Sequence, residues 1–165
     1  MKEKARKVRK DKGEKRVIWG FDSEFLMSGR KGHPEDVHSV QFSNGKDAVV
    51  LLSADELKEW LINHKWIHTV YGFVVLPDLG SVAEWLGYKH VEFKRRGVQH
   101  TGWIKYGGAK IHVVDAQPML ASFGLRRLAD CGKLIGYPKL PKPDWLGLRP
   151  WKNKKEFEDF IEYAK

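Results

Sequence analysis

Two acidic residues, Asp22 and Glu24, stand one residue apart at the end of the apolar segment 17–25 (VIWGFDSEF). Side chains alternate between the two faces of a β-strand, so this spacing predicts that both carboxylates point to one side while Ser23 points away. Two carboxylates on a rigid strand suit Mg²⁺ or Mn²⁺, which phosphodiester-cleaving enzymes use in pairs to activate water and stabilise the leaving oxygen. Because Asp-x-Glu is a short pattern with many accidental matches, two charges that simply meet solvent at a strand end are the alternative.

The chain is long enough to bury one sizeable core, since 42% of its 165 residues are hydrophobic, and we expect one main domain. No apolar run reaches the length of a membrane span, and the N-terminus is charged where a signal peptide would be hydrophobic. These features favour a soluble, cytoplasmic protein with no membrane partner. The single cysteine, Cys131, excludes an internal disulfide framework and a cysteine-rich zinc site, and the seven histidines show no spacing typical of metal ligands.

Positive charge is concentrated near the N-terminus. The formal net charge of the chain is +9, which favours a polyanionic partner without identifying it. Residues 1–16 contain nine Lys or Arg against three Asp or Glu and almost no apolar side chains. We therefore expect a flexible basic arm or a solvated helix there. A nucleic-acid-binding arm and a solubilising extension are both compatible with this composition.

Strand and helix signals follow the first strand and predict an α/β domain. Residues 37–42 and 47–52 flank an Asn-Gly pair at 44–45, which is typical of a tight hairpin turn. The sequence SADE at 53–56 matches a capping box and predicts a helix over 54–64. An antiparallel pair of strands should therefore be followed by a helix.

A third acidic residue, Asp78, follows the apolar run 66–76. That run predicts a buried strand parallel to the first, because a helical crossover precedes it. Asp78 then stands where the strand gives way to a short helix, so its carboxylate can complete a metal site with Asp22 and Glu24. Capping of the helix by Asp78 is the alternative. The sequence SVAE at 81–84 weakens it, because a second capping box can satisfy the helix N-terminus without Asp78.

Further strands and helices complete the predicted order. A Gly-Gly pair at 107–108 predicts a hairpin whose return strand joins the main sheet. Helical periodicity predicts a helix over 122–134, with Arg126 and Arg127 facing solvent, and a last helix that begins near 154. The additional strands are predicted over 91–93, 102–106 and 110–114.

A basic cluster lies between two of these strands and has aromatic residues nearby. Lys94, Arg95 and Arg96 form the cluster, and Trp103 and Tyr106 follow it. Basic side chains can follow a phosphate backbone while aromatic rings stack on bases, which predicts a surface that binds nucleic acid. A solvated turn with two aromatic rings packed underneath is the alternative.

The order of these elements resembles the 3′–5′ exonuclease domain of family B DNA polymerases, particularly the protein-primed polymerases. The resemblance covers most of residues 17–165. Residues 20–24 (GFDSE) are similar to the first exonuclease motif, and residues 71–78 take the place of the second. Residues 110–115 and the helix after them resemble the strand and helix that follow the exonuclease hairpin. Residues 162–165 (EYAK) are similar to the start of the third motif, Tyr-x-x-x-Asp.

The resemblance implies a ribonuclease H-like, DnaQ-like α/β fold, with a mixed β-sheet flanked by helices and an inserted β-hairpin. It also implies a two-metal site of Mg²⁺ or Mn²⁺, in which Asp22, Glu24 and Asp78 bind metal and Tyr163 positions the attacking water. The fourth carboxylate of the family would stand two residues beyond the last residue, so one ligand is missing. Either the domain, 17–165, is truncated within its third motif, or the site has lost a ligand. Asp159, one helical turn before Tyr163, is the available substitute.

Three further positions depart from the family or from its metal set. Phe73, Val74 and Val75 fill the region where the second motif has an Asn, and Phe25 follows the first motif where the family commonly has a Thr. Both departures concern substrate binding more than metal binding. Asp115 matches a position outside the metal set, and we expect a structural role for it.

The expected function is metal-dependent hydrolysis of single-stranded DNA from its 3′ end, the proofreading reaction of a DNA polymerase. The expected partner is single-stranded DNA or a DNA primer terminus, with a polymerase domain in the parent chain or a related stand-alone nuclease as the setting. Weak or no activity is expected of this chain, because one ligand is missing. The alternatives are a non-catalytic nucleic-acid-binding module of the same fold, and a ribonuclease or endonuclease.

Overall fold

The computed structural model describes residues 17–26, 36–136 and 140–164. The basic arm expected over 1–16 lies outside the described residues. The elements, in chain order, are β1 (Trp19–Phe25), β2 (Val37–Ser43), β3 (Ala48–Leu51), α1 (Ala54–Asn63), β4 (Thr69–Gly72), α2 (Val75–Leu86), the 3₁₀ helix η2 (Tyr88–His90), β5 (Val91–Arg96), β6 (Gln99–Tyr106), β7 (Ala109–Asp115), α3 (Gln117–Ser122), α4 (Leu128–Leu134) and α5 (Lys154–Ala164).

The strands form one mixed sheet in the order β3-β2-β1-β4-β7-β6-β5. Strands β1 to β3 form an antiparallel meander, and β5, β6 and β7 form a second one. Strand β4 joins the two meanders and is parallel to both β1 and β7. The predicted α/β class, the mixed sheet and the parallel pairing of the fourth strand with the first are therefore confirmed.

Local sequence signals account for the first hairpin and for α1. In the β2–β3 turn, Asn44 Oδ1 accepts the backbone N–H groups of Lys46 (2.9 Å) and Asp47 (2.8 Å). At the start of α1, the Ser53 hydroxyl accepts the N–H of Glu56 (3.2 Å), and the Glu56 carboxylate accepts the N–H of Leu52 (2.7 Å). Both predicted elements are confirmed, because residues within a few positions of each other define them.

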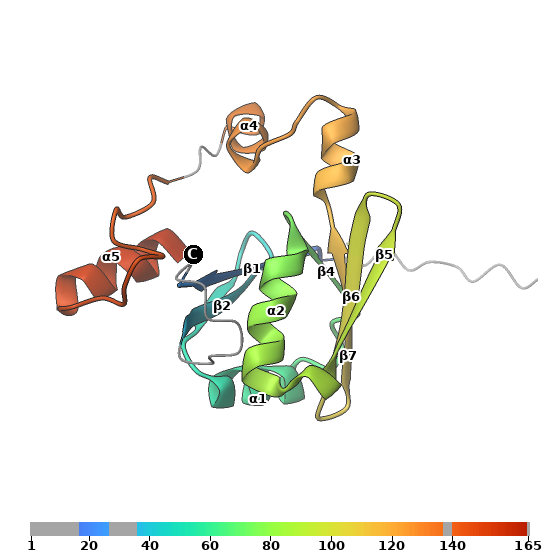
Figure 1. Ribbon diagram of the computed structural model, residues 1–165, viewed down its shortest axis with the longest axis horizontal. Helices are drawn as coiled ribbons and strands as arrows, with labels where there is room; N and C mark the ends of the chain where they lie inside the picture. The colour runs from blue at the N-terminus through green and yellow to red at the C-terminus, as the bar shows by residue number, and fades with distance from the viewer. Residues whose placement is uncertain (1–16, 27–35, 137–139, 165) are drawn as a thin grey trace, which may run out of the picture.

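Helix α2 packs across one face of the sheet, as Figure 1 shows, and contacts strands of both meanders. Leu79 and Val82 of this helix are fully buried in the same core as Ile104 of β6 and Ile111 of β7. Burial of each such aliphatic side chain contributes about 1.5–3 kcal/mol. Gly102 permits the close approach, since a Cβ atom there would lie 2.6 Å from Leu79 Cδ1.

The β4–α2 connection differs from its prediction. Strand β4 ends at Gly72 and α2 begins at Val75, whereas the apolar run predicted a strand to residue 76. The strand ends because Val74 adopts a left-handed backbone conformation with φ 62°. Its N–H donates to the side chain of Asp115 instead of to a neighbouring strand. Asp78 consequently lies in the first turn of a helix rather than at a strand end.

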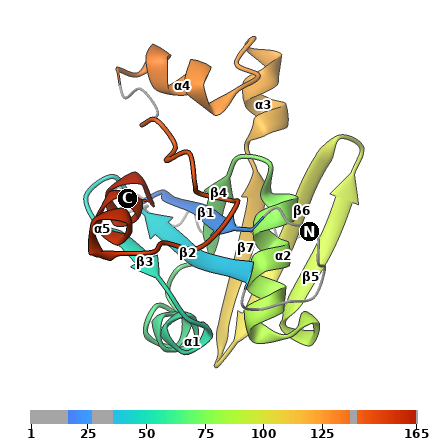
Figure 2. The ribbon, with the colours of Figure 1, turned by 60° about the vertical axis from the view of Figure 1, so that its left-hand side comes forward.

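The prediction of one continuous helix over 122–134 is also wrong. The structure has two short helices, α3 and α4, separated by residues 123–127. Gly124 lies in that break with φ 82°, a conformation that does not continue a helix. Figure 2 shows α3 and α4 beyond the end of the sheet, and α5 beside β1 and β2. Among the helices of the described ranges, none combines the length and apolar character needed to cross a membrane.

Candidate active site

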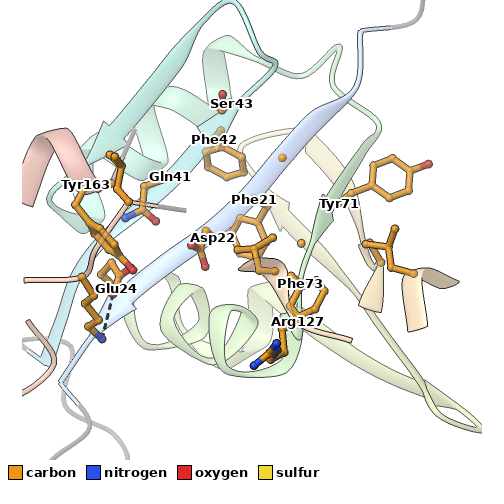
Figure 3. Close-up of a pocket in the computed structure, with 18 of the residues that line it drawn as sticks. Phe21, Asp22, Glu24, Gln41, Phe42, Ser43, Tyr71, Phe73, Arg127 and Tyr163 are labelled. Carbon is orange, nitrogen blue, oxygen red and sulfur yellow. Dashed lines mark ion pairs between the residues drawn. The ribbon is translucent and has the colours of Figure 1, made fainter. Parts of the chain in front are cut away.

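A pocket of about 960 Å³ lies at the end of β1, and Asp22, Glu24 and Tyr163 are among its lining residues. Ser23, between the two acidic residues, is buried on the other side of the strand. The prediction that Asp22 and Glu24 share one side of β1 is therefore confirmed. Figure 3 shows the Tyr163 hydroxyl pointing from α5 toward Glu24, with Asp22 beside them. The structure thus places three of the four predicted catalytic residues around one cavity.

The fourth, Asp78, is not among the residues that line the cavity; it lies in the first turn of α2 and is only 5% exposed. Its Oδ1 atom accepts the backbone N–H (3.0 Å) and the hydroxyl (2.7 Å) of Ser23. The Ser23 hydroxyl also lies 3.0 Å from the Ser81 hydroxyl. The second capping box predicted at 81–84 is wrong, because Ser81 lies within α2. Asp78 itself makes no capping hydrogen bond, since the N-cap residue is Val74.

Asp78 and Asp22 form an adjacent pair of carboxyl groups. Burial, and next the charge of Asp22, raise the pKa of Asp78 to about 8, against the opposing effect of the hydrogen bonds from Ser23. A buried carboxyl group beside a second carboxylate is stabilised either by a proton or by a cation. The oxygen donors of this pair therefore fit a divalent ion such as Mg²⁺ or Mn²⁺.

Glu24 lines the same pocket, but Glu24, Asp22 and Asp78 are not arranged as a metal-binding cluster. Its side chain is 12% exposed, and its Oε2 atom lies 4.0 Å from Lys142 Nζ. Within the described ranges, no group of three or more His, Cys, Asp or Glu side chains is arranged to hold a metal ion. Asp159, the substitute for the missing carboxylate, is exposed and does not line the pocket.

Basic residues line the pocket as well, and two of them were expected to face solvent only. Arg126 and Arg127 are exposed, yet both contribute to the pocket lining, together with Lys142. Arg127 donates two hydrogen bonds to Asp130, at 2.9 and 3.0 Å. Recognising Gly124 as a helix break would have indicated that the two arginines do not belong to a solvent-facing helix surface. Cationic groups facing Asp22 and Glu24 suit a phosphate group.

The predicted nucleic-acid-binding residues lie outside the pocket, on the β5–β6 hairpin. Lys94, Arg95 and Arg96 belong to strand β5, since pairing with β6 extends three residues beyond its predicted end, and all three are exposed. Trp103 and Tyr106 of β6 face opposite sides of the sheet, because an odd number of positions separates them. Both rings have packing partners. The Trp103 ring stacks on His112 at 4.5 Å, and the Tyr106 ring meets His90 edge-on at 5.1 Å.

These features define an α/β protein with a pocket that both carboxylates and cations line. Comparisons of the chain with protein-family models, with curated proteins and with solved structures found no match.

Proposed function

We propose that this chain is a metal-dependent nuclease domain with a ribonuclease H-like fold, of the 3′–5′ proofreading kind that belongs to family B-like DNA polymerases. The main support is the pairing of Asp22, which lines the pocket together with Tyr163, with the buried Asp78, whose pKa is raised to about 8. Buried carboxyl groups whose pKa is perturbed by a neighbouring charge are typical of catalytic and metal sites.

The order of strands supports the fold assignment. Strands β3, β2, β1, β4 and β7 form an antiparallel meander continued by two parallel strands, with α1 and α2 as the crossovers, as in ribonuclease H-like domains. The β5–β6 hairpin is inserted between α2 and β7, where the resemblance places the exonuclease hairpin. Helix α5 then brings Tyr163 back to the pocket, in the position expected of the third motif.

Asp22 and Asp78 would hold a divalent ion, and Glu24 would join them from the same strand. Such an ion supplies charge neutralisation at the phosphodiester and lowers the pKa of water. The chain's own residues do the remaining work. Tyr163 holds the attacking water by its hydroxyl, and Arg126, Arg127 and Lys142 bind the non-bridging oxygens of the phosphate. The substrate is single-stranded, because the pocket must receive a terminal nucleotide that is not paired.

One observation favours the alternative of a non-catalytic nucleic-acid-binding module. Glu24 forms an ion pair with Lys142, and among the described residues no group of three carboxylates is arranged to hold a metal ion. A module of this kind would bind single strands in a salt-sensitive way without divalent metal. A ribonuclease or an endonuclease would use the same residues as the exonuclease and differ only in its substrate.

Calorimetric titration with Mn²⁺ tests the metal site directly. The unsubstituted chain is expected to bind Mn²⁺, and the double variant Asp22→Ala, Glu24→Ala is expected to lose this binding. Asp159→Ala is the matched control, because Asp159 is an exposed carboxylate outside the pocket. Equal binding by all three proteins, or none by the unsubstituted chain, would contradict the metal site.

A nuclease assay then separates the reaction types. Labelled single strands of DNA and RNA, each with a free or a blocked 3′ end, are incubated with the chain and Mn²⁺. Cleavage of DNA that requires a free 3′ end supports the exonuclease, and cleavage of strands blocked at the 3′ end indicates an endonuclease. Salt-sensitive binding without any cleavage supports the non-catalytic module.

A further inference from the structure

In the part of the chain that the structure describes, the face of the sheet opposite α2 carries partly or fully exposed side chains from β4 to β5. On β7, alternate residues such as Ile111 and Val113 are buried beneath α2, and the intervening Lys110, His112 and Val114 lie on the other face with partial or full exposure. The same alternation along β5 places Lys94 and Arg96 on this open face. Arg95 points to the α2 side.

A straight row of cross-strand neighbours leads from the pocket over this face. Gly20 and Tyr71, which both line the pocket, are partners between β1 and β4. The row continues from Tyr71 to Val114 of β7, then to Thr101 of β6, and ends at Lys94 of β5. Four interstrand steps of about 4.8 Å give a length of roughly 19 Å. That distance accommodates several nucleotides of an extended strand.

Cationic side chains lie on or beside this row on three strands; Lys94 belongs to the row, and Lys110 lies four positions from Val114 on β7. Lys110 Nζ lies 5.0 Å from the centre of the Trp103 ring, so it extends from β7 over β6. The hydrogen bond from Lys105, and then the charges of Lys94 and Lys110, lower the pKa of Glu92. Strand alternation places these four side chains on one face. Only one acidic side chain, Glu92, accompanies Lys94, Arg96, Lys105 and Lys110 among the described residues of β5, β6 and β7 that share this face.

The exposed surface of the row also suits an extended strand. The Tyr71 side chain is 39% exposed, and Figure 3 shows its ring pointing away from Asp22. Trp103 is engaged by His112 on the sheet and by Lys110, so its ring does not offer a free stacking surface. Recognition along this face would therefore depend on the phosphate backbone more than on the bases.

We propose that this face, named here the basic track and consisting of Tyr71, Thr101, Val114, Lys94, Arg96 and Lys110, binds the sugar-phosphate backbone of a single-stranded nucleic acid whose end occupies the pocket. The proposal rests on the proposed function for the identity of the pocket. Its occupant follows from charge complementarity with a phosphodiester chain and from the continuity of the row with the pocket. The strand would leave the pocket over Tyr71 and cross β7 and β6 to reach β5.

Fluorescence anisotropy with labelled tetrathymidylate and dodecathymidylate, in EDTA so that no cleavage occurs, tests the track. The longer strand is expected to bind the unsubstituted chain at least tenfold more tightly than the shorter one. The double variant Lys94→Glu, Lys110→Glu is expected to lose this gain with length. Its slope of log affinity against log salt should also fall by about 1.4, at about 0.7 for each lost phosphate contact.

The double variant Lys46→Glu, Lys155→Glu is the matched control, because it makes the same change in net charge at exposed positions outside the track. An equal loss in both double variants would show that only net charge matters and would overturn the proposal. So would tighter binding of a dodecamer duplex than of the single strand. Circular dichroism checks that both variants fold.

Two further comparisons identify the type of nucleic acid and separate the test of the basic track from the test of the metal site. Loss of both dodecathymidylate and dodecauridylate binding in the double variant Lys94→Glu, Lys110→Glu supports binding through the backbone. In the unsubstituted chain, the oligonucleotide that binds more tightly identifies the natural sugar. Because this assay contains no metal, it can fail while the Mn²⁺ titration succeeds. In that case the proposal of the basic track is wrong and the proposed nuclease site stands. If the anisotropy assay succeeds and the Mn²⁺ titration fails, the face binds nucleic acid and the metal site is wrong.

Discussion

The buried carboxylate of Asp115 accepts the backbone N–H of Val74, 3.1 Å from its Oδ1 atom, although the two residues are 41 positions apart in the sequence. The same oxygen accepts the N–H of Gln117 at 2.9 Å. Asp115 therefore connects the turn before α2, which positions Asp78, to the start of α3. This geometry agrees with the structural role predicted for Asp115. Val74, which donates one of the two hydrogen bonds, has a strained backbone conformation, and α2 begins directly after it.

Replacement of Val74 by Gly is expected to stabilise the protein. A β-branched residue at φ 62° is strained, at a cost of about 1–3 kcal/mol. Gly removes the strain and adds about 0.5–1 kcal/mol of backbone entropy to the unfolded chain. The net effect on the free energy of unfolding should be a gain of about 1 kcal/mol, measured by urea denaturation. A Gly variant that is less stable than the original chain would show that Val74 is not strained.

Removal of the acceptor should have the opposite effect. Asp115→Ala leaves two backbone N–H groups without their partner at a position where the side chain is 2% exposed. An unsatisfied donor costs about 1–3 kcal/mol when it is buried, and these two hydrogen bonds are partly buried, so the free energy of unfolding should fall by about 1–3 kcal/mol in total. Asp115→Asn is the control, because the amide oxygen can still accept both hydrogen bonds. Equal losses in the two variants would indicate that the negative charge, and not the acceptor, is what matters.

The stability of the protein without metal should depend on pH through Asp78. Its pKa is about 8 in the folded protein against 3.8 for an ordinary Asp. Protonation of a group whose pKa is raised on folding favours the folded state. Its contribution is fully present below pH 3.8 and is lost as the pH rises through 8. Asp78→Asn, which cannot ionise, should therefore gain stability relative to the original chain over this range.

Urea denaturation in EDTA at a series of pH values measures this difference. Asp159→Asn is the control, because its carboxylate is exposed and lies outside the pocket. The stability difference between Asp78→Asn and the original chain should grow with pH, and that for Asp159→Asn should not. Addition of Mn²⁺ at pH 8 should stabilise the original chain and not the Asn variant. A difference that does not change with pH would contradict the raised pKa.

How far the sequence predicts the structure depends on how local the controlling contacts are. The Asn-Gly turn and the α1 capping box involve neighbours in the chain, and both were predicted correctly. The start of α2 depends on a hydrogen bond to Asp115, which no local pattern reveals. Strand alternation alone placed Asp22 and Glu24 on one side. It gave no indication that Lys142 lies near Glu24, because a loop brings that residue from 118 positions away.

The attachment of α5 should weaken in acid because of Glu156. Arg149 donates two hydrogen bonds to Glu156, at 2.7 and 2.8 Å, and Lys152 N–H donates a third at 2.7 Å. The bonds from Arg149, and then that from Lys152, lower the pKa of Glu156 to about 2 from 4.5. A carboxylate whose pKa is lowered on folding stabilises the folded state above its unfolded pKa, and this contribution is lost as the pH falls through 2.

Glu156→Gln should therefore lower the thermal unfolding midpoint near neutral pH, and the difference from the original chain should shrink as the pH is lowered from 4.5 toward 2. Thermal unfolding followed by circular dichroism measures this difference. Glu158→Gln is a suitable control, since its contact with Lys154 is a 3.6 Å ion pair between exposed side chains of one helix. A constant difference across the pH range would show that Glu156 acts through packing rather than through its charge.

Lys142→Ala should tighten the binding of Mn²⁺ if the proposed metal site is correct. The Lys142 ammonium group lies 4.0 Å from Glu24 Oε2 and competes with a cation for that carboxylate. Partly exposed ion pairs contribute up to about 1 kcal/mol, so affinity should rise by up to about fivefold, as measured by calorimetry. Lys142→Arg retains the charge and should leave the affinity close to its original value.

The loss of charge in Lys142→Ala should also weaken binding of single-stranded DNA, because Lys142 lines the pocket that receives the phosphate. Weaker Mn²⁺ binding in Lys142→Ala would show that Glu24 does not contribute to the metal site.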